Sequence, residues 1–139
     1  YKGASSATGD YGASSATGYC GASSATGYCG ASSATGYKGA SSATGDYGAS
    51  SATGDCGASS ATGYCGASSA DNSTAVAVAW GYESKAKGCI GAHIVCAEWK
   101  YDNLNNDWVF VGAKMSIVDG VKIKADTYYT LRDGEFVEV

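Results

Sequence analysis

Six cysteines and a single histidine are the residues of this 139-residue chain with the most specific chemistry. Thiolates can bind soft metal ions, form disulfides or act as nucleophiles. Four of the cysteines share one position of a nine-residue repeat with lysine and tyrosine, and two lie beyond the repeats: Cys20, Cys29, Cys56 and Cys65, then Cys89 and Cys96. A position that accepts Lys, Tyr or Cys is typical of an exposed corner. We therefore favour free thiols over disulfides, contacts between subunits or a metal site.

His93 lies between Cys89 and Cys96, which is the one spacing that suggests zinc. On a strand, residues 89 and 93 share one face and residue 96 points to the other, so the three cannot converge on a tetrahedral ion. Calcium-binding nonapeptide rolls need a Gly-Gly-x-Gly-x-Asp loop, which this sequence lacks. We expect no metal and no cofactor.

Other classes of function are disfavoured by composition and motifs. A net charge of −4 with only 16% charged residues argues against nucleic-acid binding, which needs clustered Lys and Arg. No apolar run approaches the ~20 residues of a membrane-spanning helix. The sequence contains no nucleophile elbow and no phosphate-binding loop, and its carboxylates are scattered, so we do not expect an enzyme. The chain starts inside a repeat, without the layout of a signal peptide, so we expect a fragment or a processed product.

The first half of the chain is a tandem array. The string GASSATG recurs every nine residues, seven times between Gly3 and Gly63, and an eighth copy stops at Ala70. Residues 1–36 and 37–72 differ at only three positions, which indicates duplication of a 36-residue block and an adjustable number of coils. Two glycines in every nine residues would each cost a helix about 1 kcal/mol. The array therefore predicts an all-β solenoid, with a disordered Gly/Ser/Ala tract as the alternative.

In the solenoid, residues 4–8 form a strand and residues 9–12 a corner. One nonapeptide is too short for two strands and two corners, so we expect two nonapeptides, or about 18 residues, in each coil. Cys20 and Cys29 then lie on opposite sides, and Cys20 meets Lys38. Alternation along the strand directs small side chains inward, with each hydroxyl bonded to a neighbouring carbonyl. This inward set comprises Ser5, Ala7, Ser14, Ala16, Ser23, Ala25, Ser32 and Ala34.

Two sets of repeated side chains would form ladders on the surface. A regular threonine face could order water as an ice-binding surface, and exposed tyrosines could stack on a glycan. The threonines are Thr8, Thr17, Thr26, Thr35, Thr44, Thr53 and Thr62, and the tyrosines are Tyr19, Tyr28, Tyr37 and Tyr64.

Ser84-x-Ala86-x-Gly88 and Ser5-x-Ala7-x-Gly9 resemble the SxAxG head repeats of trimeric autotransporter adhesins, over residues 1–92. This resemblance implies a left-handed β-roll in which three chains associate side by side. The chain also resembles nonapeptide-repeat proteins of gut bacteria and their phages that carry an AEW…ADTYY…GEFVEV tail and have no known activity. That resemblance implies an extracellular, cell-surface or virion-associated location.

After the array the sequence predicts a small cap. We divide the chain into a repeat solenoid (1–70), transitional coils (71–92) and a C-terminal module (93–139). Strands over 89–99, 108–118, 121–131 and 135–139 would form a four-stranded antiparallel meander. Its core candidates are Ile94, Trp99, Trp108, Phe110, Ile117, Val121, Ile123, Tyr128, Leu131, Phe136 and Val137.

The leading functional interpretation is a structural fibre or surface-appendage segment, with a homo-oligomer, a surface receptor or a glycan as partners. A ligand-binding repeat surface is the second interpretation. A flexible tract with tyrosines nine residues apart is the third.

Overall fold

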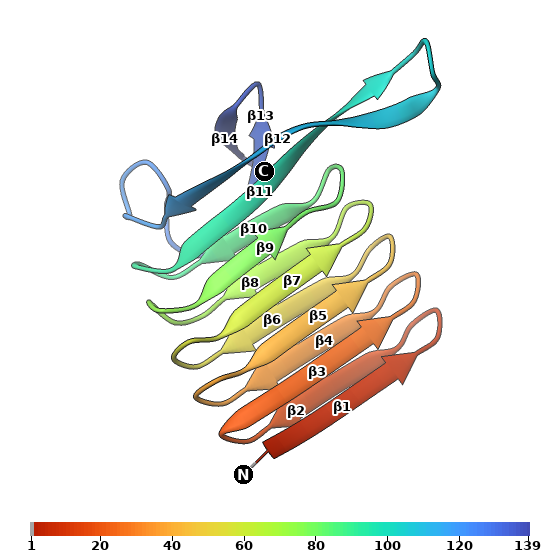
Figure 1. Ribbon diagram of the computed structural model, residues 1–139. Helices are drawn as coiled ribbons and strands as arrows, with labels where there is room; N and C mark the ends of the chain where they lie inside the picture. Colours follow the sequence, from red (N-terminus) through yellow and green to blue (C-terminus); the bar gives the residue numbers. More distant parts are fainter. Residues whose placement is uncertain (1) are drawn as a thin grey trace.

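A computed structural model describes residues 2–139, which form two seven-stranded sheets and no helix (Figure 1). The described residues therefore include no helix that is long and apolar enough to cross a bilayer. Sheet A contains, in order, β1 (Lys2–Thr8), β3 (Cys20–Thr26), β5 (Ala40–Thr44), β7 (Ala58–Thr62), β9 (Val76–Ala79), β11 (His93–Asp102) and β12 (Asp107–Ile117). Sheet B contains β2 (Ala13–Thr17), β4 (Ala31–Thr35), β6 (Ala49–Thr53), β8 (Ala67–Ala70), β10 (Lys85–Gly88), β13 (Tyr129–Arg132) and β14 (Glu135–Glu138).

Successive coils stack in parallel and in register. Ala4 pairs with Ala22, so neighbouring strands of one sheet are offset by two nonapeptides. The offset is one residue shorter only where His93 of β11 pairs with Val76 of β9. The predicted β-solenoid with two nonapeptides per coil is confirmed. The alternative of a disordered tract is wrong for the described part of the array, residues 2–70.

Glycines at the corners let the backbone of one coil lie directly on the next. Gly27 has φ +151° and donates its N–H to the carbonyl of Thr44 at 3.0 Å. A Cβ on Gly27 would overlap the carbonyl oxygen of Gly9 in the coil below. Only a residue without a side chain fits this position, because both the positive φ and the close approach exclude a Cβ.

The solenoid interior is a thin layer of serine and alanine. Ser5 and Ala7 of the first coil are partly exposed, whereas their inward equivalents in the following coils are buried: Ser14, Ala16, Ser23, Ala25, Ser32 and Ala34. The expectation that the inward hydroxyls bond to carbonyls is wrong. Each one donates to the serine hydroxyl nine residues earlier, on the opposite sheet, at 2.9–3.0 Å from Ser68 down to Ser5.

The C-terminal strands are antiparallel, as predicted, but they do not form one meander. β12 pairs with β11 and extends sheet A, whereas β13 and β14 form a hairpin that pairs with β10 and extends sheet B. Each of the two sheets therefore ends in its own hairpin at the C-terminal end of the solenoid. β11, which we assigned to the C-terminal module, also continues sheet A as the parallel neighbour of β9.

The expected strand over 121–131 is replaced by a loop and the short β13. The carboxylate of Asp119 accepts hydrogen bonds from the backbone N–H groups of Val121, Lys122 and Ile123 at 2.8–3.1 Å. These N–H groups are therefore unavailable for the backbone hydrogen bonds that would pair this segment with a neighbouring strand. An acidic side chain that bonds the following backbone in this way favours a turn over a strand.

The only conventional apolar core of the described chain lies under these hairpins. It includes Ile94, Ile123 and Leu131 as predicted, with Cys96, Val118 and Tyr129 in addition. Phe136 packs against this cluster, whereas Trp99, Tyr128 and Val137 are half-buried. Trp108 is half-buried as well, and three predicted core residues are wrong: Phe110, Ile117 and Val121 are 45%, 49% and 82% exposed.

Candidate functional surfaces and cap cleft

The threonines form two separate rows. Thr8, Thr26, Thr44 and Thr62 lie on the outer face of sheet A, and Thr17, Thr35 and Thr53 lie on that of sheet B. All are exposed except Thr62, which is half-buried. Parallel strands in register place the side chains of a row about 4.8 Å apart. Each outer face therefore presents regular rows of alanine, serine and threonine.

The tyrosines lie at the edges where the chain passes between sheets. We call the turns that lead from sheet A to sheet B the tyrosine edge; these turns are at 9–12, 27–30, 45–48, 63–66 and 81–84. Along it, ring centroids are 5.3 Å apart for Tyr28 and Tyr47, 5.9 Å for Tyr47 and Tyr64, and 5.1 Å for Tyr64 and Tyr82. On the opposite edge Tyr19 stacks on Tyr37 at 5.1 Å. Rings that pack on one another have fewer free faces for a sugar, and glycan binding by these tyrosine rows stays a prediction.

The tyrosine edge continues into the cap. Tyr82 stacks on Trp108 with centroids 4.6 Å apart and an interplanar angle of 11°. Trp99 contacts Tyr82 edge-on and donates its indole N–H to the Trp80 carbonyl at 2.7 Å. Such aromatic pairs contribute roughly 0.5–1.5 kcal/mol each beyond the area they bury. The ladder therefore joins the β11–β12 hairpin to the coils beneath it.

The six cysteines are free, and they do not meet. Cys29 and Cys65 belong to the tyrosine edge and Cys20 and Cys56 to the opposite edge. On each edge the two are one 36-residue block, or two coils, apart. Two coils correspond to about 9.6 Å, beyond the ~7 Å between Cα atoms that a disulfide allows. As expected, one coil separates Cys20 from Lys38, whose N–H bonds to the neighbouring Tyr19 carbonyl at 2.9 Å.

The titratable groups near these thiols are held by local contacts. Cys65 donates its S–H to the Glu83 carboxylate at 3.8 Å, and a hydrogen bond to the same carboxylate raises the pKa of the Tyr64 phenol. Cys96 is buried, and this desolvation raises its pKa to about 12. His93 is half-exposed on the outer face of sheet A, away from the buried Cys96. Residues 2–139 hold no cluster of three His, Cys, Asp or Glu side chains with metal-binding geometry.

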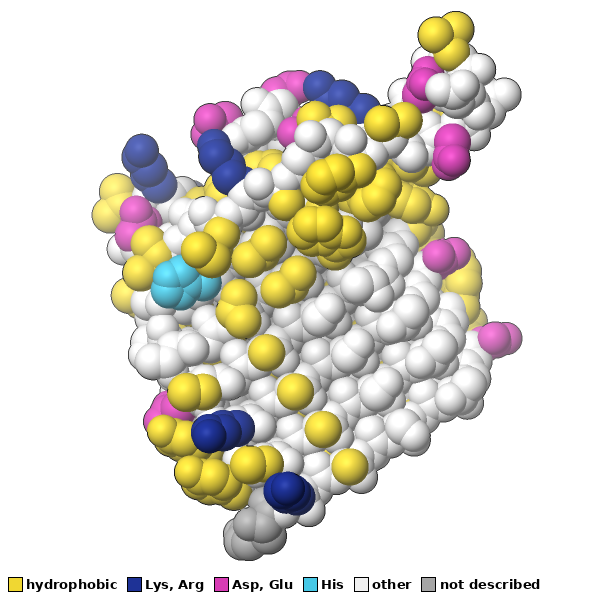
Figure 2. All heavy atoms as spheres, viewed as in Figure 1, with side chains coloured by type: hydrophobic (Ala, Val, Ile, Leu, Met, Phe, Trp, Pro, Cys, Tyr) yellow, Lys and Arg dark blue, Asp and Glu magenta, His cyan; other side chains and the backbone are white. Residues whose placement is uncertain are grey.

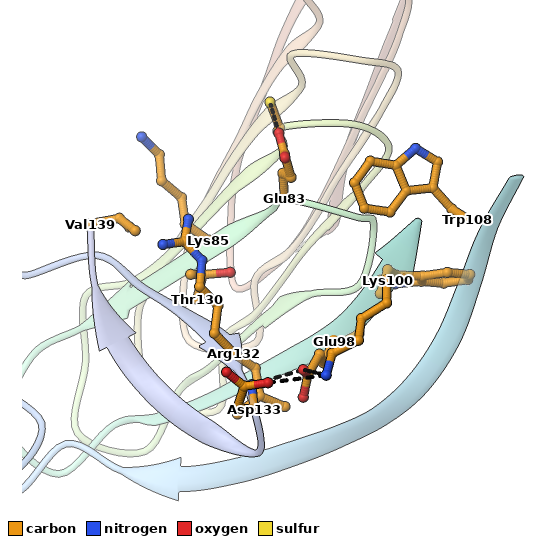
Figure 3. Close-up of a pocket in the computed structure, with 13 residues that line it drawn as sticks. Glu83, Lys85, Glu98, Lys100, Trp108, Thr130, Arg132, Asp133 and Val139 are labelled. Atoms are coloured by element: carbon orange, nitrogen blue, oxygen red, sulfur yellow. Dashed lines mark hydrogen bonds and ion pairs between the residues drawn. The ribbon is translucent and has the colours of Figure 1, made fainter. Parts of the chain in front are cut away.

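A cleft of about 520 Å³ lies between the two C-terminal hairpins and the last turn of the tyrosine edge (Figure 3). Trp108 and Glu83 line the side nearest the coils, and Lys85, Arg132 and Val139 lie across from Trp108. The cleft therefore combines an indole with cations and carboxylates. Lys85 is also held over the ring of Tyr128, with its ammonium 4.8 Å from the centroid.

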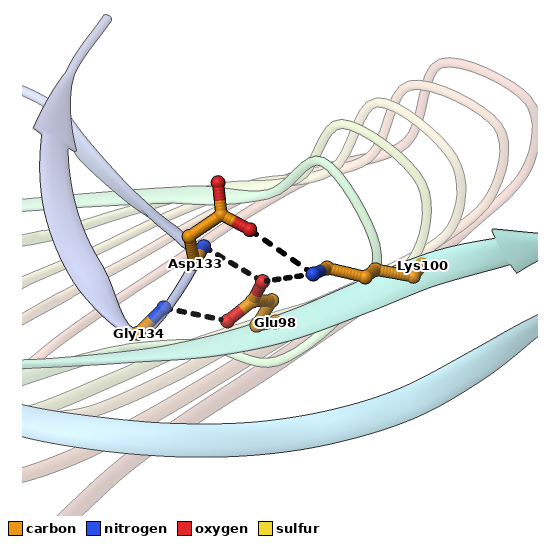
Figure 4. Close-up of polar contacts among 4 residues, drawn as sticks. All are labelled: Glu98, Lys100, Asp133 and Gly134. Carbon is orange, nitrogen blue, oxygen red and sulfur yellow. Dashed lines mark hydrogen bonds and ion pairs between the residues drawn. The ribbon is translucent and has the colours of Figure 1, made fainter.

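The floor of the cleft is a clamp around Glu98 (Figure 4). Its buried carboxylate accepts the N–H of Asp133 at 2.8 Å and that of Gly134 at 3.0 Å, both in the turn between β13 and β14. Lys100 donates to Asp133 at 3.0 Å and lies 3.8 Å from Glu98. The hydrogen bond to Asp133 raises the pKa of Lys100. Glu98 thereby ties the end of sheet A to the end of sheet B.

Sequence reasoning missed this clamp and the junction of the aromatic ladder with the cap. Glu98 carries no local signal for its role, because its donors lie 35 and 36 residues further along the chain. A signal for the ladder was present: Tyr82 is at the same corner position as Tyr64, one coil away, and Tyr28, three coils away.

Comparison with known proteins gave no match, either to a family model or to a curated protein or solved structure. The fold and the surfaces described above therefore carry the functional argument.

Proposed function

We propose that this chain is a structural, non-enzymatic segment of a fibre or surface appendage, built as a rigid β-solenoid shaft with a C-terminal cap. One observation carries the proposal: identical coils stack in register and share one continuous chain of serine hydroxyls. Each further coil repeats the contacts of the last, so the length of the shaft can change without a new core.

The cap supports the same proposal. A solenoid end exposes unpaired backbone groups that invite further strands. Here antiparallel hairpins end both sheets, and the Glu98 clamp joins them. Growth by parallel stacking therefore stops at this end, as a shaft of defined length requires.

The test is to change the number of coils. Deletion of residues 10–45 joins Gly9 to Asp46 and removes one 36-residue block, or two coils. The rod should shorten by about 9.6 Å in small-angle X-ray scattering and keep its β-sheet circular dichroism spectrum. Duplication of the block should lengthen it equally.

The matched control deletes residues 10–13 alone, which moves the first strand out of phase with the coils above it. This variant should lose the pairing of its first coil. If the block deletion unfolds the chain, or leaves its length unchanged, the proposal of a modular shaft is wrong.

A second candidate function is favoured by the threonine rows: an ice-binding face. The outer faces of the coils bear small uncharged side chains at regular spacing, with Thr35 near the centre of the row on sheet B. Thermal hysteresis at millimolar protein should then appear, and Thr35→Lys should abolish it whereas Tyr37→Lys, at the edge, should not. No hysteresis in the parent chain would exclude this candidate.

Location and assembly belong to the proposal as well. An appendage segment would lie on a cell surface or a virion and contact further copies of itself or a receptor. The implied association of three chains, and the bacterial or phage source, rest only on the sequence resemblances described above.

A further inference from the structure

The last complete coil carries apolar side chains on one outer face and charged side chains on the other. β9 of sheet A presents Val76 and Val78, whereas β10 of sheet B presents Lys85 and Lys87. The four residues occupy the same two positions of the repeat, because β9 pairs in register with β7 and β10 with β8. Equivalent positions of the repeat thus carry valine on the outer face of sheet A and lysine on the outer face of sheet B.

The valines belong to a larger apolar patch on the outer face of sheet A. Met115 and Ile117 of β12 are 64% and 49% exposed, and Trp80 is 41% exposed. The patch comprises Val76, Val78, Trp80, Val95, Met115 and Ile117, and His93 lies between Val76 and Ile117. Figure 2 shows it above the rows of small residues, with charged side chains only at the margins of the face. Soluble proteins rarely expose a contiguous apolar patch unless it is an interaction site, so this patch indicates a surface that is covered.

We propose that the outer face of sheet A packs against the same face of a second copy of this chain, as a two-fold symmetric pair. Flat sheet faces pack about 10 Å apart, and a face that meets its own copy forms an isologous contact. Seven strands of about five residues have a projected area on the order of 500 Å². The accessible surface of the side chains on this face is larger than the projected area. It therefore approaches the ~800 Å² that each partner buries in a standard interface.

A second copy of this chain is the partner that best fits the outer face of sheet A. The covering surface must be flat, uncharged and wide enough to span the coils and the patch, and sheet A of another chain meets all three conditions. Sheet B does not, because Asp71, Lys85 and Lys87 would be buried there without a partner of opposite charge. The pairing is two-fold and therefore differs from the three-chain association that the resemblance implies.

Sedimentation velocity over a micromolar to millimolar concentration series tests the pairing. The parent chain should be a dimer, and Val78→Lys should raise the dissociation constant on the order of 100-fold, because it places like charges near each other across the contact. Lys87→Glu is the matched control at the same repeat position on sheet B and should leave the constant unchanged. Ser60→Lys, one coil below Val78, replaces the first variant if that one fails to fold.

A monomer throughout the series would overturn the proposal, as would a trimer or a dimer that Val78→Lys leaves intact. The inference rests on the fold and not on the proposed appendage role. A monomeric rod whose length still follows the number of coils would contradict the pairing and leave the proposed shaft intact.

Discussion

The hydroxyl of Ser41 on sheet A donates to the hydroxyl of Ser32 on sheet B at 3.0 Å, inside the solenoid. Both serines are 4% exposed. This bond repeats in every coil between Ser5 and Ser68, so the polar interior is satisfied by its own members. Buried hydroxyls can therefore replace apolar side chains in a rod this thin, provided that the chain is unbroken.

Ser41→Ala should break that chain. The hydroxyl of Ser50 loses its acceptor, and an unsatisfied buried donor costs about 1–3 kcal/mol. Ser42→Ala changes the neighbouring outward residue and should shift the free energy of unfolding by less than about 0.5 kcal/mol. Guanidinium denaturation of both variants gives the comparison. Equal effects would mean that the serine chain contributes nothing.

Gly27→Ala should destabilise the rod strongly, because the new Cβ meets the Gly9 carbonyl and the residue keeps a positive φ. Strain of this kind costs about 1–3 kcal/mol before the displacement of the neighbouring coil. Gly112→Ala is the control, since a Cβ there meets nothing within 4 Å. The midpoint of thermal unfolding should fall for the first variant and stay level or rise for the second.

Glu98→Ala should loosen the cap and leave the coils intact. Hydrogen bonds to a charged acceptor contribute about 1.5–3 kcal/mol, and two amides lose theirs here. Hydrogen exchange should accelerate at Asp133 and Gly134 but not in the array. Glu135→Ala removes only an exposed ion pair with Lys114 at 3.6 Å and should have little effect. Unchanged protection at the β13–β14 turn in Glu98→Ala would contradict the clamp.

The loop at Asp119 should be sensitive to acid. Backbone hydrogen bonds from Val121, Ile123 and Lys122 lower the pKa of Asp119 below its usual value of 3.8. A lowered folded-state pKa means that this stabilisation is full above the unfolded value and is lost as the pH falls through the folded one. Amide exchange at these residues should therefore rise only below about pH 4. Asp119→Asn should remove this pH dependence. If the pH dependence persists in the variant, another titrating group causes it.

The solenoid was predictable because its information is local and repeated. A strict nonapeptide with small alternating residues and corner glycines fixes the strand and the corner, and the need for two of each fixes two nonapeptides per coil. The direction of the inward hydroxyls was not predictable from one repeat, because the acceptor of Ser41 belongs to a strand of the other sheet.

The cap was harder because several of its determinants are distant contacts. Residues 121–131 alternate like a strand, but Asp119 takes the N–H groups that a ladder would need. Trp108 and Phe110 look like core residues in sequence. Their partners, however, are Tyr82 and Trp80 on the surface ladder, so they close the tyrosine edge and leave the interior to smaller side chains.

Amide hydrogen exchange of the intact chain tests the central claim most directly. If the array is a rigid rod, the inter-strand amides from Ala22 to Ala70 should be as well protected as those of β11. Exchange of these amides at the rate of an unstructured chain would contradict the solenoid and every surface derived from it.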